Sequence, residues 1–327
     1  MAATDLHLVV DIGAWWITAV FESAGTVQPL VVDGRGRSPS GVFHDGQAFT
    51  AGTAALTAGA FRPDGYRPDP MTLLRHGGTS DPSFDPVTAV AAVLAHVADH
   101  AAGRITALTV VTAQSWGQPA LQRLSRAAAT ARLPRPRVTT AGAALAALAG
   151  TRVVLVALTG TAWPELSVLA AADDGYRQLA AAPVRAPGAP AVDEALLRIA
   201  AARAGFEADP DDWRLTREIE QTRALLAVQP RAPMLLPEPH EAIVLSRDDL
   251  AIAVAAHVDR LPEVIKQVLA DAEVTPAEVG AVVLAGEETG LATALRGAGL
   301  PAPITVIDPH AAVRGAAQTP RRPWWRR

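Results

Sequence analysis

The stretch that decides the fold is residues 8–21, Leu-Val-Val-Asp-Ile-Gly-Ala-Trp-Trp-Ile-Thr-Ala-Val-Phe. One apolar run ends at Asp11-Ile12-Gly13 and a second begins shortly after it, which predicts a β-hairpin with a carboxylate at the end of its first strand. Gly13 allows a sharp turn and a close approach of the backbone to a ligand. An aspartate in such a place can hold a hydrated metal ion beside phosphates. Trp15 and Trp16 follow where a small hydroxyl would serve that purpose, and we expect their indoles to pack or fill space rather than to stack on a ligand.

The pattern around this hairpin predicts two lobes, each with antiparallel strands followed by alternating helices and strands. We assign lobe I to residues 1–150, with an outer insertion at about 34–85, and lobe II to 151–318, with a reduced outer insertion at about 206–273. A long helix over 247–272 should break near Pro262, because proline removes a backbone donor and clashes with the preceding turn. The expected fold is therefore α/β, with mixed sheets flanked by helices and a central cleft.

Composition narrows the class of protein. The 327 residues carry a formal charge of −4, which gives no overall field for nucleic acid. There is no cysteine, so disulfides and thiolate metal sites are excluded. No apolar run approaches the ~20 residues of a membrane span, and the first residues do not form a signal peptide. We expect a cytoplasmic protein, and abundant Ala, Arg and Pro with few Lys indicate an actinobacterial type of genome.

Several blocks in order along the chain resemble the ATPase domain of the DnaK-type seventy-kilodalton heat-shock chaperones, of the actin-like ATPase superfamily. That family's Asp-Leu-Gly-Thr-Thr is similar to residues 11–15, and its Glu-Pro-Thr-Ala-Ala-Ala-Leu-Ala-Tyr-Gly is similar to residues 141–150. Its Glu-Arg-Ala-Lys resembles residues 220–223, its Val-Leu-Val-Gly-Gly-Ser-Thr-Arg resembles 283–290, and its Asp-Pro-Asp-Glu-Ala-Val-Ala-Leu-Gly-Ala-Ala resembles 308–317. The resemblance implies a two-lobe, ribonuclease H-like fold without the peptide-binding domain, and ATP or ADP with magnesium as the ligand.

Residue by residue, the resemblance implies a nucleotide site of which only remnants persist. The implied contacts with phosphate or adenosine are Asp11, Gly13, Gly160, Glu220, Arg223 and Gly286. On the residues alone, Glu220 and Arg223 are three positions apart and would form an ordinary pair on a helix surface.

The departures from the family pattern fall on the hydrolytic groups. The family's second phosphate-loop aspartate is Ala157 here, its glutamate near the water is Ala141, and its adenine-stacking arginine is Gly290. Trp15, Trp163 and Glu287 are candidates to fill the cleft. Because hydrolysis needs metal, base and positioned charge together, we predict no catalytic and no metal-binding residue, and little or no nucleotide binding.

The tail has a different character, with Arg321, Arg322, Trp324, Trp325, Arg326 and Arg327 in its last seven residues. Arginine beside tryptophan suits a membrane surface or an acidic partner, and the alternative is a disordered basic end. Three hypotheses follow. The first is a pseudo-ATPase that acts as a scaffold or regulatory partner of another protein. The second is a weak but active ATPase or sugar-kinase relative, in which Arg75 or other groups substitute for the missing ones, and the third is an accessory protein of an actinobacterial envelope or secretion system, peripheral to the inner membrane face.

Overall fold

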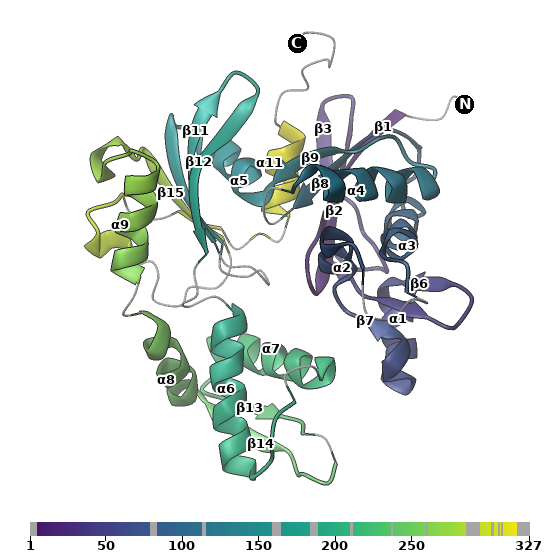
Figure 1. Cartoon of the computed structure of the whole chain (residues 1–327), viewed down its shortest axis with the longest axis vertical. Helices are drawn as coiled ribbons and strands as arrows, with labels where there is room; N and C mark the ends of the chain where they lie inside the picture. The colour runs from purple at the N-terminus through teal and green to yellow at the C-terminus, as the bar shows by residue number, and fades with distance from the viewer. Residues whose placement is uncertain are drawn as a thin grey trace. The chain divides into compact units, whose positions relative to one another are not determined.

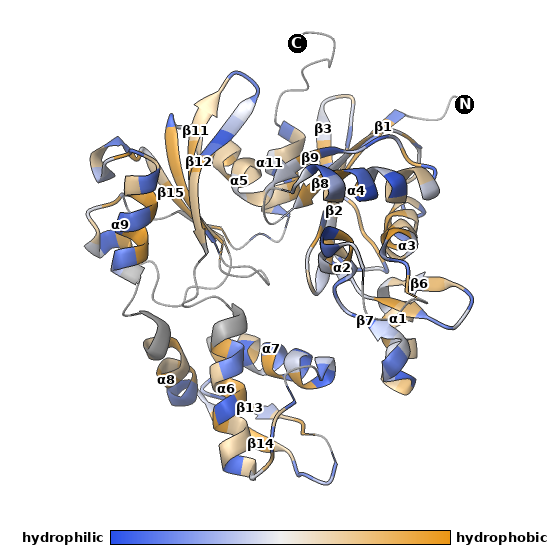
Figure 2. Ribbon diagram, viewed as in Figure 1, coloured by the Kyte–Doolittle hydropathy of each residue, from blue (hydrophilic) through white to orange (hydrophobic). Residues whose placement is uncertain are grey.

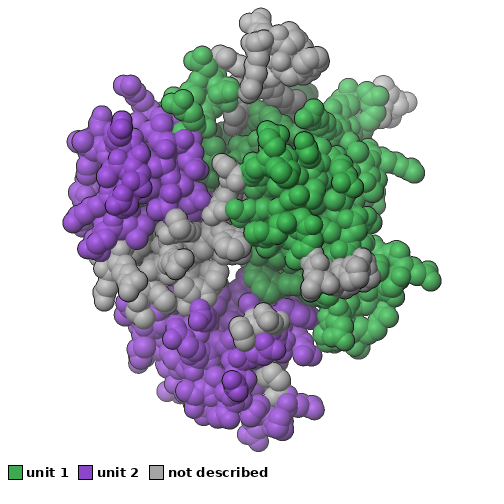
Figure 3. Space-filling model, viewed as in Figure 1, with its two compact units in different colours: residues 1–150, 171–177, 307–327 green, residues 151–170, 178–306 purple. Residues whose placement is uncertain are grey.

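The computed structural model describes residues 5–78, 84–112, 116–158, 165–183, 189–209, 212–236, 238–258, 261–285, 295–301, 304–306, 308 and 310–318. The chain forms two compact units, coloured separately in Figure 3. Unit 1 consists of residues 1–150, 171–177 and 307–327, and unit 2 consists of residues 151–170 and 178–306. The chain therefore leaves unit 1 after Gly150, returns to it for residues 171–177 and returns again for the last residues from 307.

Unit 1 is built on a mixed sheet with the order β3-β2-β1-β8-β9, with β4 beside β2 (Figure 1). Strands β3, β2 and β1 pair antiparallel, whereas β8 and β9 run parallel to β1. The strands of this sheet are β1 (Asp5–Ile12), β2 (Trp16–Ser23), β3 (Thr26–Pro29), β4 (Ser38–Pro39), β8 (Arg104–Thr112) and β9 (Arg137–Thr140). The hairpin predicted from residues 8–21 is confirmed as β1 and β2.

Helices cover both faces of this sheet, which explains why β1 is buried at every position from Leu6 to Val10. The helices of unit 1 are α1 (Gly52–Phe61), α2 (Pro70–His76), α3 (Pro86–Ala98), α4 (Gln118–Thr130), α5 (Ala141–Ala149) and α11 (Ala311–Gln318). Leu8, Val10 and Ile12 share one core with α3 and α4. Because side chains alternate along a strand, His7, Val9 and Asp11 point to the opposite face, the one on which α11 packs.

A small sheet of order β6-β5-β7 lies between β4 and α3 in the sequence. Its elements are β5 (Val42–His44), β6 (Phe49–Ala51), the 3₁₀ turn Pro63–Gly65 and β7 (Tyr66–Arg67). The prolines at 63, 68 and 70 predict an irregular loop over residues 62–70, and this pattern alone does not predict α2. The signal for α2 is present, because Asp69 accepts a hydrogen bond from the Thr72 amide as its cap and Pro70 occupies its first turn.

Unit 2 repeats the order of the first sheet. Its five strands run β12-β11-β10-β15-β16, with β10 antiparallel to β11 and parallel to β15. The strands are β10 (Val153–Leu158), β11 (Glu165–Ala172), β12 (Gly175–Pro183), β15 (Ala281–Ala285) and β16 (Ile304–Val306). Both sheets thus place three consecutive strands on one side and two parallel strands on the other, and the predicted α/β class with mixed sheets is confirmed.

A second core in unit 2 is formed by helices and a two-stranded sheet. Its elements, with the two that lead back to β15, are α6 (Ala189–Ala204), α7 (Trp213–Val228), β13 (Arg231–Met234), β14 (Ile243–Ser246), α8 (Arg247–Val258), α9 (Leu261–Asp271) and the 3₁₀ turn Pro276–Glu278. Apolar residues of α6, α7, α8, β13 and β14 fill this core, and Figure 2 colours hydrophobic residues orange along the ribbon. The predicted break near Pro262 is confirmed, since α8 ends at Val258 and α9 begins at Leu261.

Helix α11 returns the chain to unit 1 by crossing α5 at very short range. A Cβ atom on Gly315 would lie 1.9 Å from the carbonyl oxygen of Ala144, a backbone atom that cannot rotate away. Arg137 of β9 strengthens the same junction, because its Nη2 donates to the Ala316 carbonyl oxygen at 3.0 Å. The small residues of both helices are therefore a packing requirement.

We predict that Gly315→Ala lowers the free energy of unfolding by about 1–3 kcal/mol, because the two helices must separate to admit the methyl group. Urea denaturation followed by circular dichroism measures the change. Gly117→Ala is the matched control in the same unit, since a Cβ atom there meets its nearest neighbour at an ordinary 3.8 Å. Equal stability of the Gly315→Ala variant and the wild type would contradict the close crossing.

Candidate functional site

Strand β1 of the first sheet and strand β10 of the second sheet occupy the same position in the strand order, but they carry different residues near their ends. In β1, Asp11 pairs with Thr18 one step before the last pair of the hairpin, and it lies beside Val111 of the parallel strand β8. In β10, Ala157 pairs with Leu166 one step before the last pair, beside Leu284 of the parallel strand β15. Ala157 thus holds in unit 2 the register position that Asp11 holds in unit 1, and it is fully buried.

Asp11 is a carboxylate in a poorly solvated place. Burial raises the pKa of Asp11 from its ordinary 3.8 to about 7. No hydrogen bond or ion pair joins its side chain to another residue within the described part of the chain. Near neutral pH the group is therefore divided between its protonated and ionised forms, and the residue as a whole keeps partial solvent exposure.

The turn after Asp11 is closed by backbone contacts. The Gly13 amide donates to the Trp16 carbonyl oxygen at 2.9 Å, and a Cβ atom on Gly13 would approach that oxygen to 3.2 Å. The amide of Ser40 donates to the Trp15 carbonyl oxygen at 3.0 Å. Arg37 places its guanidinium 4.8 Å from the centre of a Trp16 ring. Both indoles are partly exposed, so neither is a core residue.

Ser38 and Ser40 belong to the segment that contacts this turn, and Asp33 holds that segment in place through hydrogen bonds. One carboxylate oxygen of Asp33 accepts hydrogen bonds from the Ser38 hydroxyl at 2.5 Å and the Thr53 amide at 2.9 Å, and the other lies 3.1 Å from Nε2 of His96. Burial alone would raise the pKa of Asp33, but these hydrogen bonds and the attraction of His96 outweigh it and lower the pKa to about 2. Gly52 has φ +69° and no room for a side chain, because a Cβ atom would lie 2.3 Å from His96.

A buried carboxylate at the corresponding turn of unit 2 escaped the sequence analysis. Glu165, the first residue of β11, pairs in register with Leu158 at the end of β10 and is 6 % exposed. The Ser167 hydroxyl donates to one of its oxygens. The signal was an acidic residue opening an otherwise apolar strand, which by itself indicates only a strand boundary.

The resemblance implies that Arg223 contacts the adenosine, but in the structure Arg223 forms an ion pair within unit 2. Its Nε donates to Oδ1 of Asp193 at 2.5 Å, and both residues are buried. Burial raises the pKa of Asp193 even though the arginine opposes this. The expectation of a surface pair between Glu220 and Arg223 is wrong for the arginine, which is 4 % exposed, whereas Glu220 is partly exposed.

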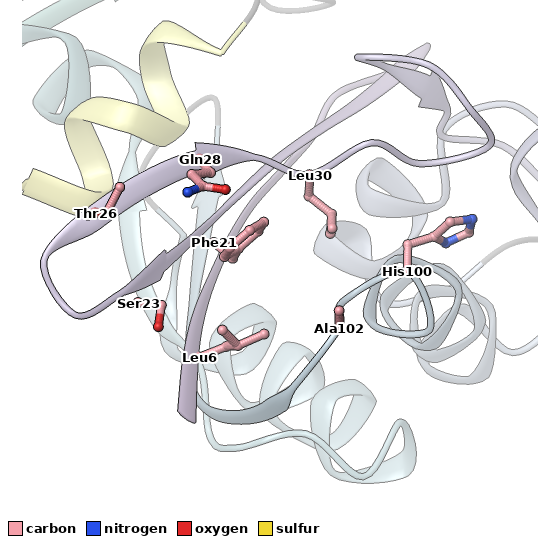
Figure 4. Close-up of a pocket in the computed structure, with 8 residues that line it drawn as sticks. All are labelled: Leu6, Phe21, Ser23, Thr26, Gln28, Leu30, His100 and Ala102. Atoms are coloured by element: carbon pink, nitrogen blue, oxygen red, sulfur yellow. The ribbon is translucent and has the colours of Figure 1, made fainter. Parts of the chain in front are cut away.

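Four of the predicted nucleotide-site and cleft residues lie outside the described part of the chain: Gly160, Trp163, Gly286 and Glu287. The six predicted tail residues also lie outside it: Arg321, Arg322, Trp324, Trp325, Arg326 and Arg327. A hollow of about 420 Å³ occurs in unit 1, but none of the predicted residues lines it (Figure 4). It is walled by β1–β3 together with His100 and Ala102, and it has no carboxylate, lysine or arginine to hold a charged ligand.

Two broader features of the described residues bear on the kind of site. Their His, Asp and Glu side chains do not gather in threes in a way that would hold a metal ion. Among the described helices, none has the length and apolar character needed to cross a membrane.

Comparison with known proteins found no match among protein-family models or among curated proteins.

Replacing Asp11 tests its raised pKa. A carboxyl group whose pKa is higher in the folded state than in the unfolded state destabilises the folded state when it ionises. This destabilisation is absent below about pH 4, because the group is then protonated in both states. It grows between about pH 4 and pH 7 and is constant at higher pH. The full shift corresponds to ~4 kcal/mol, but because Asp11 is partly exposed we expect Asp11→Asn to stabilise by about 1–2 kcal/mol at pH 8. Urea denaturation at pH 4.5 and 8 measures this.

The control for that experiment is Asp5→Asn at the exposed start of the same strand, where the carboxylate is 61 % exposed. It should change stability little at either pH. A stabilisation by Asp11→Asn that is equal at both pH values would contradict a pKa near 7.

The stabilisation that Asp33 provides should depend on pH in the opposite direction to that of Asp11. Its folded-state pKa lies below the ordinary value, so its contribution is complete above about pH 4 and is lost as the pH falls toward 2. We expect Asp33→Asn to be less stable than the wild type by ~1 kcal/mol at pH 7, after allowance for solvent screening. The difference should shrink when urea denaturation is repeated at pH 3, and a difference that is constant with pH would exclude the carboxylate as its source.

Proposed function

We propose that the chain has the two-lobe actin-like ATPase fold and acts as a pseudo-ATPase, a scaffold or regulatory partner of another protein. The fold assignment is supported by the two sheets, β3-β2-β1-β8-β9 and β12-β11-β10-β15-β16, which share one order. It is also supported by the return of α11 to unit 1 after the second sheet is complete. A duplicated sheet of this kind is what the sequence resemblance to the chaperone ATPase domain leads us to expect.

One observation carries the functional proposal: Ala157 stands where the register of β10 would require the second carboxylate. In ATPases of this class, metal ions neutralise the charge that develops during phosphoryl transfer, so the residues that hold the metal ion are indispensable. A buried methyl group has no lone pairs, and none of the neighbours that pair with Ala157, namely Leu166 and Leu284, can supply them. Within the described residues, Ala157 and the two residues paired with it therefore supply no ligand to a metal ion.

The other residues that the resemblance assigns to the nucleotide, Asp11 and Arg223, are also poorly suited to bind it. A pKa near 7 means that Asp11 carries a full negative charge only part of the time at neutral pH. Arg223 is already paired with Asp193, so its guanidinium would have to leave a buried ion pair to reach a nucleotide. We therefore propose that a nucleotide, ATP or ADP with magnesium, is bound weakly or not at all.

A second candidate function, a slow ATPase, is favoured by one feature. Asp11 is ionisable, lies at a strand end next to Gly13, and has no partner within the described part of the chain. A divalent cation would lower its pKa and give the carboxylate the counter-charge that it lacks. This candidate predicts turnover, whereas the scaffold predicts none.

A phosphate-release assay with magnesium and ATP distinguishes the two candidates. We expect the wild type to release phosphate no faster than the buffer blank and no faster than the Asp11→Asn variant. The Asp5→Asn protein serves as the matched control, since it removes an exposed carboxylate from the same strand. Magnesium-dependent turnover that is present in the wild type and in Asp5→Asn but lost in Asp11→Asn would establish the ATPase instead.

A further inference from the structure

The hollow in unit 1 is a second place where a small molecule could bind, and it involves none of the residues assigned to the nucleotide (Figure 4). Its volume of about 420 Å³ falls within the ~300–1,000 Å³ that small-molecule sites occupy. Strands β1–β3 form most of its wall, and the connection between α3 and β8 closes it with His100 and Ala102. The hollow therefore lies within one unit and depends on one body of the fold.

One side of the hollow is apolar. Leu6 of β1, Phe21 of β2 and Leu30, which follows β3, line this side. Leu6 and Leu30 are each 4 % exposed and belong to the buried residues of the unit, so the core fixes them. Phe21 packs against the same core but remains partly exposed. An aromatic ring held in this way offers a flat apolar surface to a ligand.

The other side of the hollow is polar and carries two hydroxyl groups and an amide. Phe21 pairs with Gln28, and Ser23 pairs with Thr26, across β2 and β3. Because side chains alternate along a strand, these four side chains point to the same face of the sheet. Within the described part of the chain, the side chains of Ser23, Thr26 and Gln28 have no hydrogen-bond partner. Three groups that can both donate and accept hydrogen bonds are thus available beside the aromatic ring.

The wall of the hollow carries no charge. His100 is its only ionisable lining residue, and both nitrogens of that ring are engaged within the fold. Nδ1 of His100 lies 2.8 Å from the His96 carbonyl oxygen, and Nε2 accepts a hydrogen bond from the Asp33 amide at 3.3 Å. A carbonyl oxygen only accepts and an amide only donates, so the imidazole has its proton on Nδ1 and is neutral.

We propose that the hollow binds an uncharged ring compound that carries hydroxyl groups, the chemical class of sugars and their glycosides. Such a ring has an apolar face that can pack on Phe21, and hydroxyl groups at its edge that can pair with Ser23, Thr26 and Gln28. A phosphate or carboxylate would lose water here without gaining a cation. A purely apolar ligand would leave the three polar side chains desolvated and unpaired.

An NMR titration of the ¹⁵N-labelled full chain with the phenyl glycosides of glucose, galactose and mannose tests the proposal. We expect at least one of them to bind saturably with a dissociation constant of roughly 0.1–1 mM, a usual affinity for neutral ligands of this size. The shifted amides should be those of β1–β3 and of the connection between α3 and β8. Phenyl glucuronide, which adds a carboxylate to the glucoside, should bind roughly tenfold more weakly than the glucoside or not at all.

Two variants locate the binding at the hollow. Ala102→Phe places an aromatic ring at an exposed position of its wall and should abolish binding. Thr26→Ala combined with Gln28→Ala removes two of the polar groups and should weaken binding roughly tenfold. The matched control is Gln47→Ala combined with Thr50→Ala, because these two residues are exposed in the same unit and do not line the hollow. This control should keep the wild-type affinity.

Thermal unfolding of each variant shows whether it is folded, and the double alanine variant decides the matter if Ala102→Phe is not. The proposal would be overturned by the absence of saturable shifts with all three glycosides, or by equal affinity for the glucoside and the glucuronide. Undiminished affinity in the folded wall variants, or an equal loss in the control, would also overturn it. The titrations contain neither nucleotide nor magnesium, so their outcome is independent of the phosphate-release assay.

Discussion

The constraint on which the rest of this structure depends is the desolvation of a carboxylate at the end of a strand that is buried on both faces. Strand β1 can pair with β2 and β8 and carry helices on both sides because five of its eight residues are apolar. The buried His7 has a hydrogen-bond partner in Thr109, whereas the Asp11 side chain, near the end of the strand, has none among the described residues. The pKa of Asp11 therefore rises to about 7, and the protein carries there an acid for which no described residue compensates. The structure keeps that cost although the corresponding register position in unit 2 is Ala157.

The two units show how a duplicated architecture can diverge at one position while its framework stays intact. Both sheets retain the same strand order, and the contact of Gly315 with Ala144 still draws the last helix onto α5. The differences lie at the ends of the central strands, where unit 1 has Asp11 and unit 2 has Ala157 followed by the buried Glu165 at the start of β11.

Much of the framework could be predicted from the sequence, and the reasons are local. The runs 8–10 and 153–158 are apolar, and a proline is tolerated in the first turn of a helix but not in its interior, so the strands and the break before α9 were foreseen. Helix α2 was missed because a proline-rich stretch hid the cap Asp69-Pro70. At the candidate site, the sequence could identify Asp11 and Ala157 but not the partners that decide their chemistry. Asp193 is thirty residues from Arg223, and Asp33 is more than sixty residues from His96 and His100, so those ion pairs depend on the tertiary fold.

The measurement that tests the account most directly is the titration of the Asp11 carboxyl carbon by NMR, with ¹³C-labelled aspartate and the Asp11→Asn variant to assign the signal. If magnesium and ATP do not bind at this strand end, we predict that the Asp11 pKa is near 7 in the protein alone and keeps the same value after magnesium and ATP are added together. A metal ion bound against this carboxylate would favour its ionised form. A fall of the Asp11 pKa toward its ordinary value when magnesium and ATP are present would contradict the account, because it would show that the strand end still holds a cation beside a nucleotide.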